Sequence, residues 1–314
     1  MFIICFFEDD LRKVKINLET KLGRLKLSTP IICASGTFGF GGELKDLVDF
    51  DSIGAVVTKT ITLKPRKGNP PPRIFELDYG ILNSIGLENP GLDLFIKEKL
   101  PKLKKLKTKF IVSVGGNLGE EYEEIVKELN KIKDIEVIEL NLSCPNIKLK
   151  RMISQSKNLT YRLLKNLREK TDKVLIAKIT PEVTDIVEIA KVVKKVEIDA
   201  ISLVNTFLGL SISIDKQKPI LGNIYGGYSG KAIKPLSLYR VWCIARNVNI
   251  PIIGGGGIEN TEDAIEFILV GATCISLGTI NLVYPNRAKE ILQGIKNYLK
   301  KKKRENLEKI RGII

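Results

Sequence analysis

The segment Val137–Asn146 (VIELNLSCPN) places a thiol between two carboxamides, directly after an apolar run. An apolar run bounded by turn residues predicts a buried strand. Polar groups just beyond the carboxyl end of such a strand are where parallel α/β folds carry out chemistry. An isolated cysteine is more often inert buried filler. Cys144, however, lies with Asn141 and Asn146 in a predicted loop, where a thiolate of reference pKa about 8.5 would be a competent base.

The residue types that are missing narrow the chemistry further. The 314 residues include no histidine, which excludes Ser-His-Asp catalysis and histidine-ligated metals. The cysteines are scattered and form no Cys-x-x-Cys pair, so we expect no zinc or iron–sulfur site within this chain. They are Cys5, Cys33, Cys144, Cys243 and Cys274. A thiol therefore has few competitors as the proton-transfer group.

Composition favours a cytoplasmic protein. No apolar run is long enough to span a membrane, and the start MFIICFFEDDLRK lacks the basic region and small-residue cleavage site of a signal peptide. The formal net charge of +15 fits attraction to anionic ligands or to nucleic acid. Much of it lies in Lys97–Lys109 and Lys300–Arg304, which we interpret as solvated faces.

Eight apolar runs predict strands, and helical periodicity fills most of the gaps between them. The predicted strands are Pro30–Ala34, Gly54–Thr58, Phe110–Val114, Glu136–Leu140, Val174–Ala177, Ala200–Val204, Ile250–Ile253 and Thr273–Leu277. The predicted helices are Glu120–Lys131, Leu159–Lys170, Thr184–Lys195, Leu236–Asn247, Thr261–Val270 and Pro285–Leu299. Strands alternating with helices indicate a parallel sheet of the α/β class, and eight repeats predict one closed (β/α)8 barrel domain over residues 1–314.

Several smaller features complete this barrel. Val14–Leu18 and Leu25–Leu27, joined through Gly23, predict a hairpin that closes the barrel floor. Ile61–Leu87 and Phe207–Gly230 are longer than the barrel needs, and long loops in a compact domain are usually lids or binding segments. Thr184 and Thr261 are the expected helix caps.

The residues that follow the predicted strands should converge at one mouth of the barrel. Lys59 and Lys178 are there, and a lysine in such a place is costly to desolvate unless it meets a negative charge, otherwise it reaches toward water. Carboxamides gathered there can match the alternating N–H and C=O edge of a pyrimidine, although each alone could be a turn former. They are Asn83, Asn141, Asn146 and Asn205.

Glycines after the last two strands predict a phosphate site. The run Ile252–Gly257 (IIGGGG) and the pair Gly278-Thr279 permit close approach of backbone N–H groups to an anion. Loops after strands seven and eight commonly hold a phosphate in such barrels. Tight turns alone would also explain each glycine group, but both groups fall in the two expected loops.

Together these motifs resemble dihydroorotate dehydrogenase, the flavin enzyme of pyrimidine synthesis. The matching segments run in family order over nearly the whole chain. They are ASGTFGFGGE (Ala34–Glu43), TKTITLKPRKGNPPPRIFE (Thr58–Glu76), NSIGLENPG (Asn83–Gly91), LNLSCPN (Leu140–Asn146), VNT (Val204–Thr206), GGYSGKAIKP (Gly226–Pro235) and IPIIGGGGI (Ile250–Ile258). GNPPPR and GGYSGKAIKP look most like the class I subgroup whose catalytic chain pairs with an iron–sulfur flavoprotein and passes electrons to NAD.

The resemblance implies a barrel that holds FMN, with Cys144 taking a proton from C5 of dihydroorotate while a hydride leaves C6 for flavin N5. The positions that match substrate-binding residues are Lys59, Asn83, Ser84, Ile85, Gly86, Leu87, Asn141, Asn146, Asn205 and Thr206. Those that match FMN-binding residues are Ser35, Lys59, Thr60, Asn117, Asn141, Lys178, Val204, Gly230, Gly256, Gly257, Gly278 and Thr279. FAD and a [2Fe-2S] cluster are expected only on the partner subunit, and the catalytic chain is expected to form a homodimer.

One segment departs from the subgroup. After Asn146 the chain continues IKLKRMISQSKNL instead of a glycine-rich run ending in Phe-Gly, so we expect a more basic lid over the substrate. Lid closure often controls turnover.

Three other functions remain open at this point. A related homodimeric form reduces fumarate, and tRNA dihydrouridine synthases also use an FMN barrel with a strand-four cysteine. The positive charge would suit a polyanion, but this chain has little spare length for the additional RNA-binding domain of those enzymes. The last alternative is a non-catalytic flavin- or phosphate-binding barrel.

Overall fold

The computed structural model describes residues 15–44, 46–117, 119–143, 145–146 and 151–314. Within them, eight parallel strands close into a barrel in the order β11-β12-β17-β18-β3-β4-β7-β8. Each of these strands falls on one of the eight predicted apolar runs. Their bounds are β3 Ile31–Cys33, β4 Ala55–Val57, β7 Lys109–Val114, β8 Val137–Asn141, β11 Val174–Lys178, β12 Ala200–Leu203, β17 Ile252–Gly255 and β18 Cys274–Leu277. The predicted (β/α)8 barrel is confirmed.

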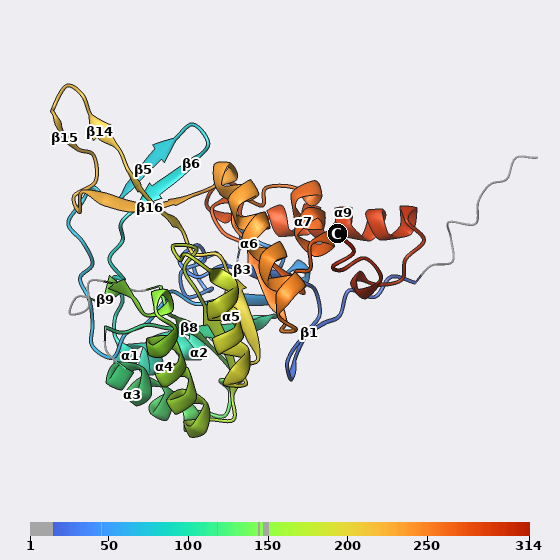
Figure 1. Cartoon of the computed structure of the whole chain (residues 1–314), viewed down its shortest axis with the longest axis horizontal. Coiled ribbons are helices and arrows are strands. Elements are labelled where there is room, and N and C mark those ends of the chain that lie inside the picture. The colour runs from blue at the N-terminus through green and yellow to red at the C-terminus, as the bar shows by residue number, and fades with distance from the viewer. Residues whose placement is uncertain (1–14, 45, 118, 144, 147–150) are drawn as a thin grey trace, which may run out of the picture.

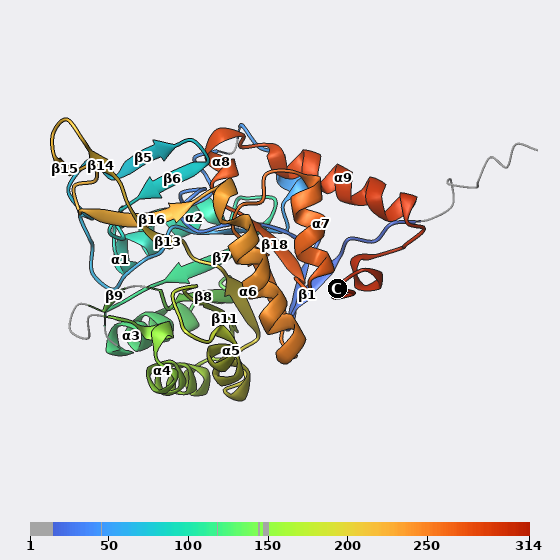
Figure 2. The same cartoon turned by 45° about the horizontal axis from the view of Figure 1, so that its top comes forward.

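The strands are buried on both faces, because helices cover the outside of the barrel. Along β8, Ile138 and Leu140 pack in the core between strands and helices, whereas Val137 belongs to a second core inside the barrel. The surrounding helices are α3 Gly119–Asn130, α4 Lys157–Lys170, α5 Ile186–Lys195, α6 Lys234–Asn247, α7 Thr261–Leu269 and α9 Arg287–Lys301. Figures 1 and 2 show α3, α4 and α5 on one side of the barrel and α6, α7 and α9 on another.

Both predicted helix caps were wrong by one residue. The N-cap of α5 is Asp185, whose side chain accepts from the backbone N–H groups of Val187 and Glu188. The N-cap of α7 is Asn260, which accepts from the N–H of Asp263. Aspartate and asparagine side chains satisfy the free amides of a helix start better than threonine does, and each lies directly beside the threonine that sequence reasoning chose.

One helical segment was not predicted. It lies between β4 and β7 and runs from α1 (Leu92–Leu94) through a π-helical turn, Phe95–Lys99, into α2 (Leu100–Leu103). Its lysines had been interpreted only as a solvated face. Leu92, Phe95, Leu100 and Leu103 are nevertheless buried in the main core. A short helix, α8 (Ile280–Val283), also follows β18.

The predicted hairpin is present, but its first strand was placed too early. It consists of β1 (Thr20–Leu22) and β2 (Leu25–Leu27), which turn at Gly23 with a φ of 56°. Leu22, Leu25 and Leu27 pack in the inner core of the barrel with residues such as Val137 and Ile176. Alternation of buried and exposed residues fits Thr20–Leu22, and this apolar face closes the barrel floor.

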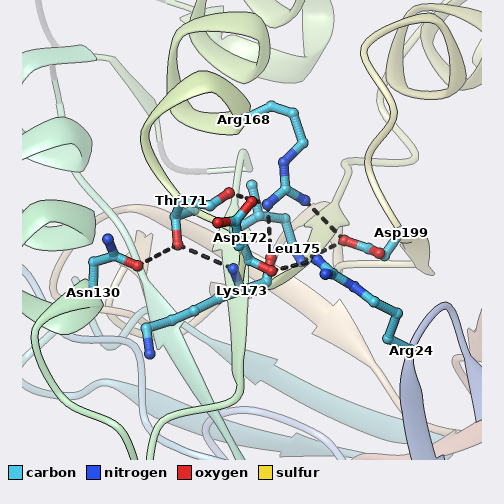
Figure 3. Close-up of polar contacts among 8 residues, drawn as sticks. All are labelled: Arg24, Asn130, Arg168, Thr171, Asp172, Lys173, Leu175 and Asp199. Atoms are coloured by element: carbon cyan, nitrogen blue, oxygen red, sulfur yellow. Dashed lines mark hydrogen bonds and ion pairs between the residues drawn. The ribbon is translucent and has the colours of Figure 1, made fainter.

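A polar network ties the barrel floor together next to this hairpin (Figure 3). Arg168 at the end of α4 lies 3.0 Å from Asp199 Oδ2 and donates to the carbonyl of Lys173 at 2.9 Å. Asp199 also accepts from the N–H of Leu175 at 2.9 Å, and Arg24 of the hairpin turn donates to the carbonyl of Asp172. The Arg168–Asp199 ion pair therefore joins the α4–β11 and α5–β12 connections, and Arg24 ties the hairpin to the first of them.

The two long loops form a single additional sheet. β5 (Ile74–Leu77) and β6 (Gly80–Asn83) come from the first loop, and β13 (Phe207–Leu210) and β16 (Tyr225–Ser229) from the second. They pair in the order β13-β16-β6-β5, with Asn83 opposite Gly227. A short hairpin of β14 (Ile212–Ser213) and β15 (Lys218–Pro219) projects from this sheet (Figure 1). After β8, β9 (Pro145–Asn146) pairs with β10 (Arg151–Met152).

No helix in the described part of the chain is both long and apolar enough to cross a membrane. Within the same residues, no group of histidine, cysteine, aspartate or glutamate side chains is suited to hold a metal ion.

Candidate active site

A cavity of about 290 Å³ lies at the carboxyl ends of the barrel strands. Strands β11, β12, β17 and β18 and the loop after β3 contribute its inner wall, and β5, β6 and β16 of the additional sheet contribute its cover. Many of the residues predicted for the site line it. They are Ser35, Asn83, Ile85, Lys178, Val204, Asn205, Thr206, Gly230, Gly256, Gly257, Gly278 and Thr279.

One edge of the cavity is a cradle of free backbone amides. Among the residues described, the N–H groups of Gly256, Gly257 and Gly278 donate to no protein acceptor. Gly256 and Gly257 have φ values of 110° and 88°, and a Cβ at Gly256 would lie 2.4 Å from Ser237 Oγ. At Gly278 a Cβ would meet no atom within 4 Å, so that side of the residue is open. Converging amides of this kind suit a phosphate.

The cradle is held in shape by a second group of contacts. Asp263 accepts from the N–H groups of Glu259 and Asn260 and lies 2.7 Å from Lys234 Nζ. Burial lowers the pKa of Lys234, but the hydrogen bonds to Asp263 and Glu266 outweigh burial and raise it. On the other side, Thr279 Oγ1 donates to Ser229 Oγ at 2.9 Å and joins the last barrel loop to β16.

Lys178 supplies a buried positive charge to the same cavity. It ends β11, lines the cavity and is only 9% exposed. In the part of the chain that the structure describes, its ammonium makes no ion pair with a carboxylate within 4 Å. A buried ammonium needs a compensating negative charge. The cavity is therefore built to receive an anionic group beside Lys178.

Lys59 was expected at the cavity but already has a protein partner. Its Nζ lies 3.5 Å from Glu88 Oε2, and the same oxygen lies 3.0 Å from Arg73 Nη1. The side chain of Lys59 remains 29% exposed and does not belong to the cavity wall. Its ammonium is oriented by Glu88, which directly follows the first long loop.

Thr60 and Asn141 lie behind the wall and contact it through Ser35. Asn141 Nδ2 donates to Thr60 Oγ1 at 3.3 Å, and Thr60 Oγ1 lies 3.3 Å from Ser35 Oγ. Asn141 Oδ1 accepts from the N–H of Ser143 at 3.3 Å, which fixes the direction of the carboxamide. These three predicted FMN residues are thus brought together by hydrogen bonds.

Two other carboxamides present complementary groups to the cavity. Asn83 Nδ2 donates to the carbonyl of Gly227 at 3.1 Å, and within the described part of the chain its oxygen accepts no hydrogen bond. Asn205 Oδ1 accepts from the N–H of Thr206 at 2.9 Å, which leaves its amide N–H groups as free donors among the described residues. A free acceptor and free donors along the wall of one cavity suit a ring with alternating N–H and C=O groups.

The other predicted residues of the first long loop support this wall instead of lining it. Ser84 Oγ accepts from Asn69 Nδ2 at 2.8 Å. Gly86 and Leu87 adopt φ values of 73° and 54°, and a Cβ at Gly86 would lie 2.5 Å from the backbone nitrogen of Asn69. This strained turn positions Ile85, which lines the cavity.

Three predicted residues are not placed on the cavity wall. The backbone N–H of Asn117 donates to Glu121, and Asn117 does not belong to the cavity wall. Cys144, the predicted base, lies outside the described residues. Asn146 lies in β9, but the position of its side chain is likewise outside the description.

Sequence reasoning missed several hydroxyl groups of the cavity wall. These are Thr37, Ser202, Ser229 and Ser276. Ser202 and Ser276 lie one residue before the ends of β12 and β18, where an alternation count along the strand would have placed them inward. A larger groove of about 870 Å³ lies between residues 40–51 and the lysines of 99–107, and it contains none of the predicted site residues.

The comparisons with known proteins agree with this geometry. The family model described as dihydroorotate dehydrogenase matches residues 17–299. A protein of Desulforamulus reducens named dihydroorotate dehydrogenase B (NAD(+)), catalytic subunit, is 46% identical over 287 residues, which cover 91% of this chain and 94% of that protein. Proteins of the same name from Geotalea uraniireducens and Caldicellulosiruptor saccharolyticus are 42% and 44% identical, over 96% and 95% of this chain and 99% of each relative. The chain therefore belongs to the dihydroorotate dehydrogenase family.

Proposed function

We propose that this chain oxidises dihydroorotate to orotate in de novo pyrimidine biosynthesis, with FMN bound in the cavity at the barrel mouth. The observation that carries the proposal is Lys178, a buried ammonium without a carboxylate partner among the described residues, facing a cavity edged by free amides. A cationic wall beside an amide cradle suits a ligand that carries both a phosphate and a ring able to hold negative charge. FMN has both groups.

The residues present fit FMN. Gly256, Gly257 and Gly278 would hold its phosphate, since their N–H groups are free and a side chain at these positions would narrow the cradle. Lys178 would stabilise negative charge on the ring, and Ser35, held from behind by Thr60 and Asn141, would bind its polar edge. When bound, FMN supplies the hydride acceptor, which no side chain of the protein can provide.

The remaining chemistry belongs to the chain itself. Cys144, as thiolate, would take the proton from C5 of dihydroorotate. The Lys59 ammonium and the amides of Ile85–Leu87 would bind the substrate carboxylate, and Asn83 and Asn205 would hold the ring amides. The strained turn at Gly86 and the pairing of Lys59 with Glu88 place these groups before substrate arrives, which lowers the entropic cost of reaching a reactive geometry.

We further propose the NAD-linked form of the reaction. Electrons would leave through an iron–sulfur flavoprotein subunit that carries FAD and a [2Fe-2S] cluster. The names of the relatives, each a catalytic subunit of an NAD(+)-dependent enzyme, support this. In this proposal, residues 1–314 form one FMN-binding domain that assembles as a cytoplasmic homodimer, and neither nucleic acid nor a membrane takes part.

The proposal is tested by anaerobic reduction. Protein purified with FMN should be yellow, and its visible flavin absorption should bleach on addition of dihydroorotate. Reoxidation by NAD only in the presence of a co-purified partner supports the NAD-linked form, whereas reoxidation by fumarate would favour the homodimeric fumarate-reducing enzyme. Retention of tRNA without bleaching would favour a dihydrouridine synthase, and bound FMN with neither response would favour a non-catalytic barrel.

A further inference from the structure

A carboxylate is buried inside the barrel, one layer deeper than the predicted flavin residues. Glu139 lies on β8, two residues before Asn141, and is only 2% exposed. Its neighbours Ile138 and Leu140 pack toward the helices, so Glu139 points into the barrel. Burying a charge is costly unless it is hydrogen-bonded. The proposed reaction gives the Glu139 carboxylate no role.

A continuous chain of hydrogen bonds joins this carboxylate to the site. Ser113, the partner of Glu139 in the β7–β8 ladder, donates from Oγ to Glu139 Oε1 at 3.1 Å. Ser113 Oγ also lies 2.9 Å from Thr60 Oγ1. Thr60 Oγ1 in turn accepts from Asn141 Nδ2 at 3.3 Å. One side chain, Ser113, therefore links the interior charge to two predicted FMN residues, Thr60 and Asn141.

An ionised Glu139 carboxylate gives the chain of hydrogen bonds a single direction. Because it can only accept, the Ser113 proton points at Glu139, and the Ser113 lone pairs take the Thr60 proton. Thr60 then presents only lone pairs, one of which meets Asn141 Nδ2. Without the charge, the Ser113 hydroxyl could instead donate to Thr60 Oγ1, and the Thr60 proton would then turn toward Ser35 Oγ at 3.3 Å.

The charge of Glu139 is also placed to act on the same ligand as Lys178. In the β8–β11 ladder, Asn141 stands opposite Lys178 and Glu139 opposite Ile176. The anion and the cation thus occupy neighbouring strands in successive layers of the barrel interior. A fixed negative charge near a flavin disfavours its reduction, and a positive one favours it.

We propose that Glu139 is a positioning residue for the flavin: through Ser113 it orients the Thr60 hydroxyl that accepts from Asn141, and its charge lowers the reduction potential that Lys178 raises. This inference rests on the proposed function, because it requires FMN in the cavity. It differs from a merely structural role, in which the network would only hold β4, β7 and β8 together. Such a role would leave the potential of bound FMN unchanged.

The test is Glu139→Gln, which keeps the volume and an accepting oxygen but removes the charge. The midpoint potential of bound FMN is measured by anaerobic photoreduction with reference dyes. We expect the equilibrium constant for flavin reduction to rise by about tenfold, which corresponds to about 30 mV for a two-electron couple. Glu139→Asp retains the charge and should stay close to the wild type.

Two further variants complete the design. Glu136→Gln removes an exposed carboxylate, 53% exposed and paired with Lys109, just before the same strand, and should leave the potential unchanged. Ser113→Ala keeps the charge of Glu139 but interrupts the chain of hydrogen bonds. We expect the apoprotein of this variant to bind FMN about tenfold more weakly, as measured by fluorescence quenching. The midpoint potential of bound FMN should change less than in Glu139→Gln. This second readout also decides the matter if Glu139→Gln does not fold.

The outcomes distinguish a failure of the inference about Glu139 from a failure of the proposed function. FMN-loaded Glu139→Gln with the wild-type potential would overturn the inference, as would Ser113→Ala with unchanged FMN affinity. A wild-type protein that binds no FMN would instead overturn the proposed function on which the inference rests.

Discussion

Lys59 and Arg73 meet at one carboxylate oxygen of Glu88, at 3.5 Å and 3.0 Å respectively. The three residues come from the end of β4, from the first long loop and from the turn after β6. The ion pairs hold the Lys59 ammonium in place in the absence of substrate. Exposed pairs contribute little to stability, so we interpret this arrangement as a means of placing a cation.

The first prediction concerns that cation. Lys59→Ala should weaken orotate binding about 10- to 100-fold, because a charge-assisted hydrogen bond to the substrate carboxylate is lost. The measurement is a titration of the flavin absorption spectrum with orotate. Lys64→Ala, an exposed lysine of the same loop, is the control and should bind orotate normally. Equal affinity in both variants would contradict a role for Lys59.

The second prediction tests the amide cradle. Gly278→Ala should fold normally, since the new Cβ meets no protein atom within 4 Å, but should weaken FMN binding at least tenfold, or about 1.4 kcal/mol. Isothermal titration of the apoprotein with FMN measures the loss. Gly42→Ala is matched, because its Cβ also meets nothing within 4 Å but lies in the groove beside α2. If the two variants bind FMN alike, the phosphate is held elsewhere.

The third prediction concerns the barrel floor. Arg168→Leu removes the partner of Asp199, and both side chains are less than a fifth exposed, at 17% and 14%. The apoprotein should lose about 2–3 kcal/mol of unfolding free energy in urea, since a largely buried charge is left unpaired. Lys165→Ala on the same helix breaks only an exposed pair with Glu169 and should cost less than about 0.5 kcal/mol. A loss equal to that of the control would show that the floor network is not stabilising.

The fourth prediction uses the thiols. Burial raises the pKa of Cys33 and of Cys274, so both should stay protonated and unreactive toward iodoacetamide at about pH 8, whereas half-buried Cys243 reacts slowly. Cys144 should react in the free enzyme and be protected by orotate. Peptide mass mapping reports each site separately. Labelling of Cys144 that is indifferent to orotate would place the thiol away from the substrate.

Local pattern was sufficient to predict much of this molecule. The eight strands are short apolar runs such as Leu175–Ala177, and parallel topology alone brings their carboxyl ends to one mouth. Lys178 and the glycines at 256, 257 and 278 follow from that rule, and the structure places all of them on one cavity.

The contacts that join distant segments were beyond sequence reasoning. Asn83 pairs with Gly227 across 144 residues, and nothing in either loop indicates that the two form one sheet. Glu88 is a protein partner of Lys59, whereas the sequence had pointed to an anionic ligand or to water. Ser113 and Glu139 were hidden because each sits inside an apolar run, where only strand register shows that they face one another.

The central claim is that the Cys144 thiolate would remove the C5 proton of dihydroorotate, with FMN supplying the hydride acceptor. The direct measurement is the single-turnover rate of FMN reduction by dihydroorotate, followed anaerobically in a stopped-flow spectrometer across pH, for the wild type, Cys144→Ala and the control Cys243→Ala. We expect wild type and control to speed up toward a thiol pKa of about 8.5, and Cys144→Ala to keep its FMN but react about 10²- to 10⁴-fold more slowly. Undiminished reduction in Cys144→Ala would contradict the account.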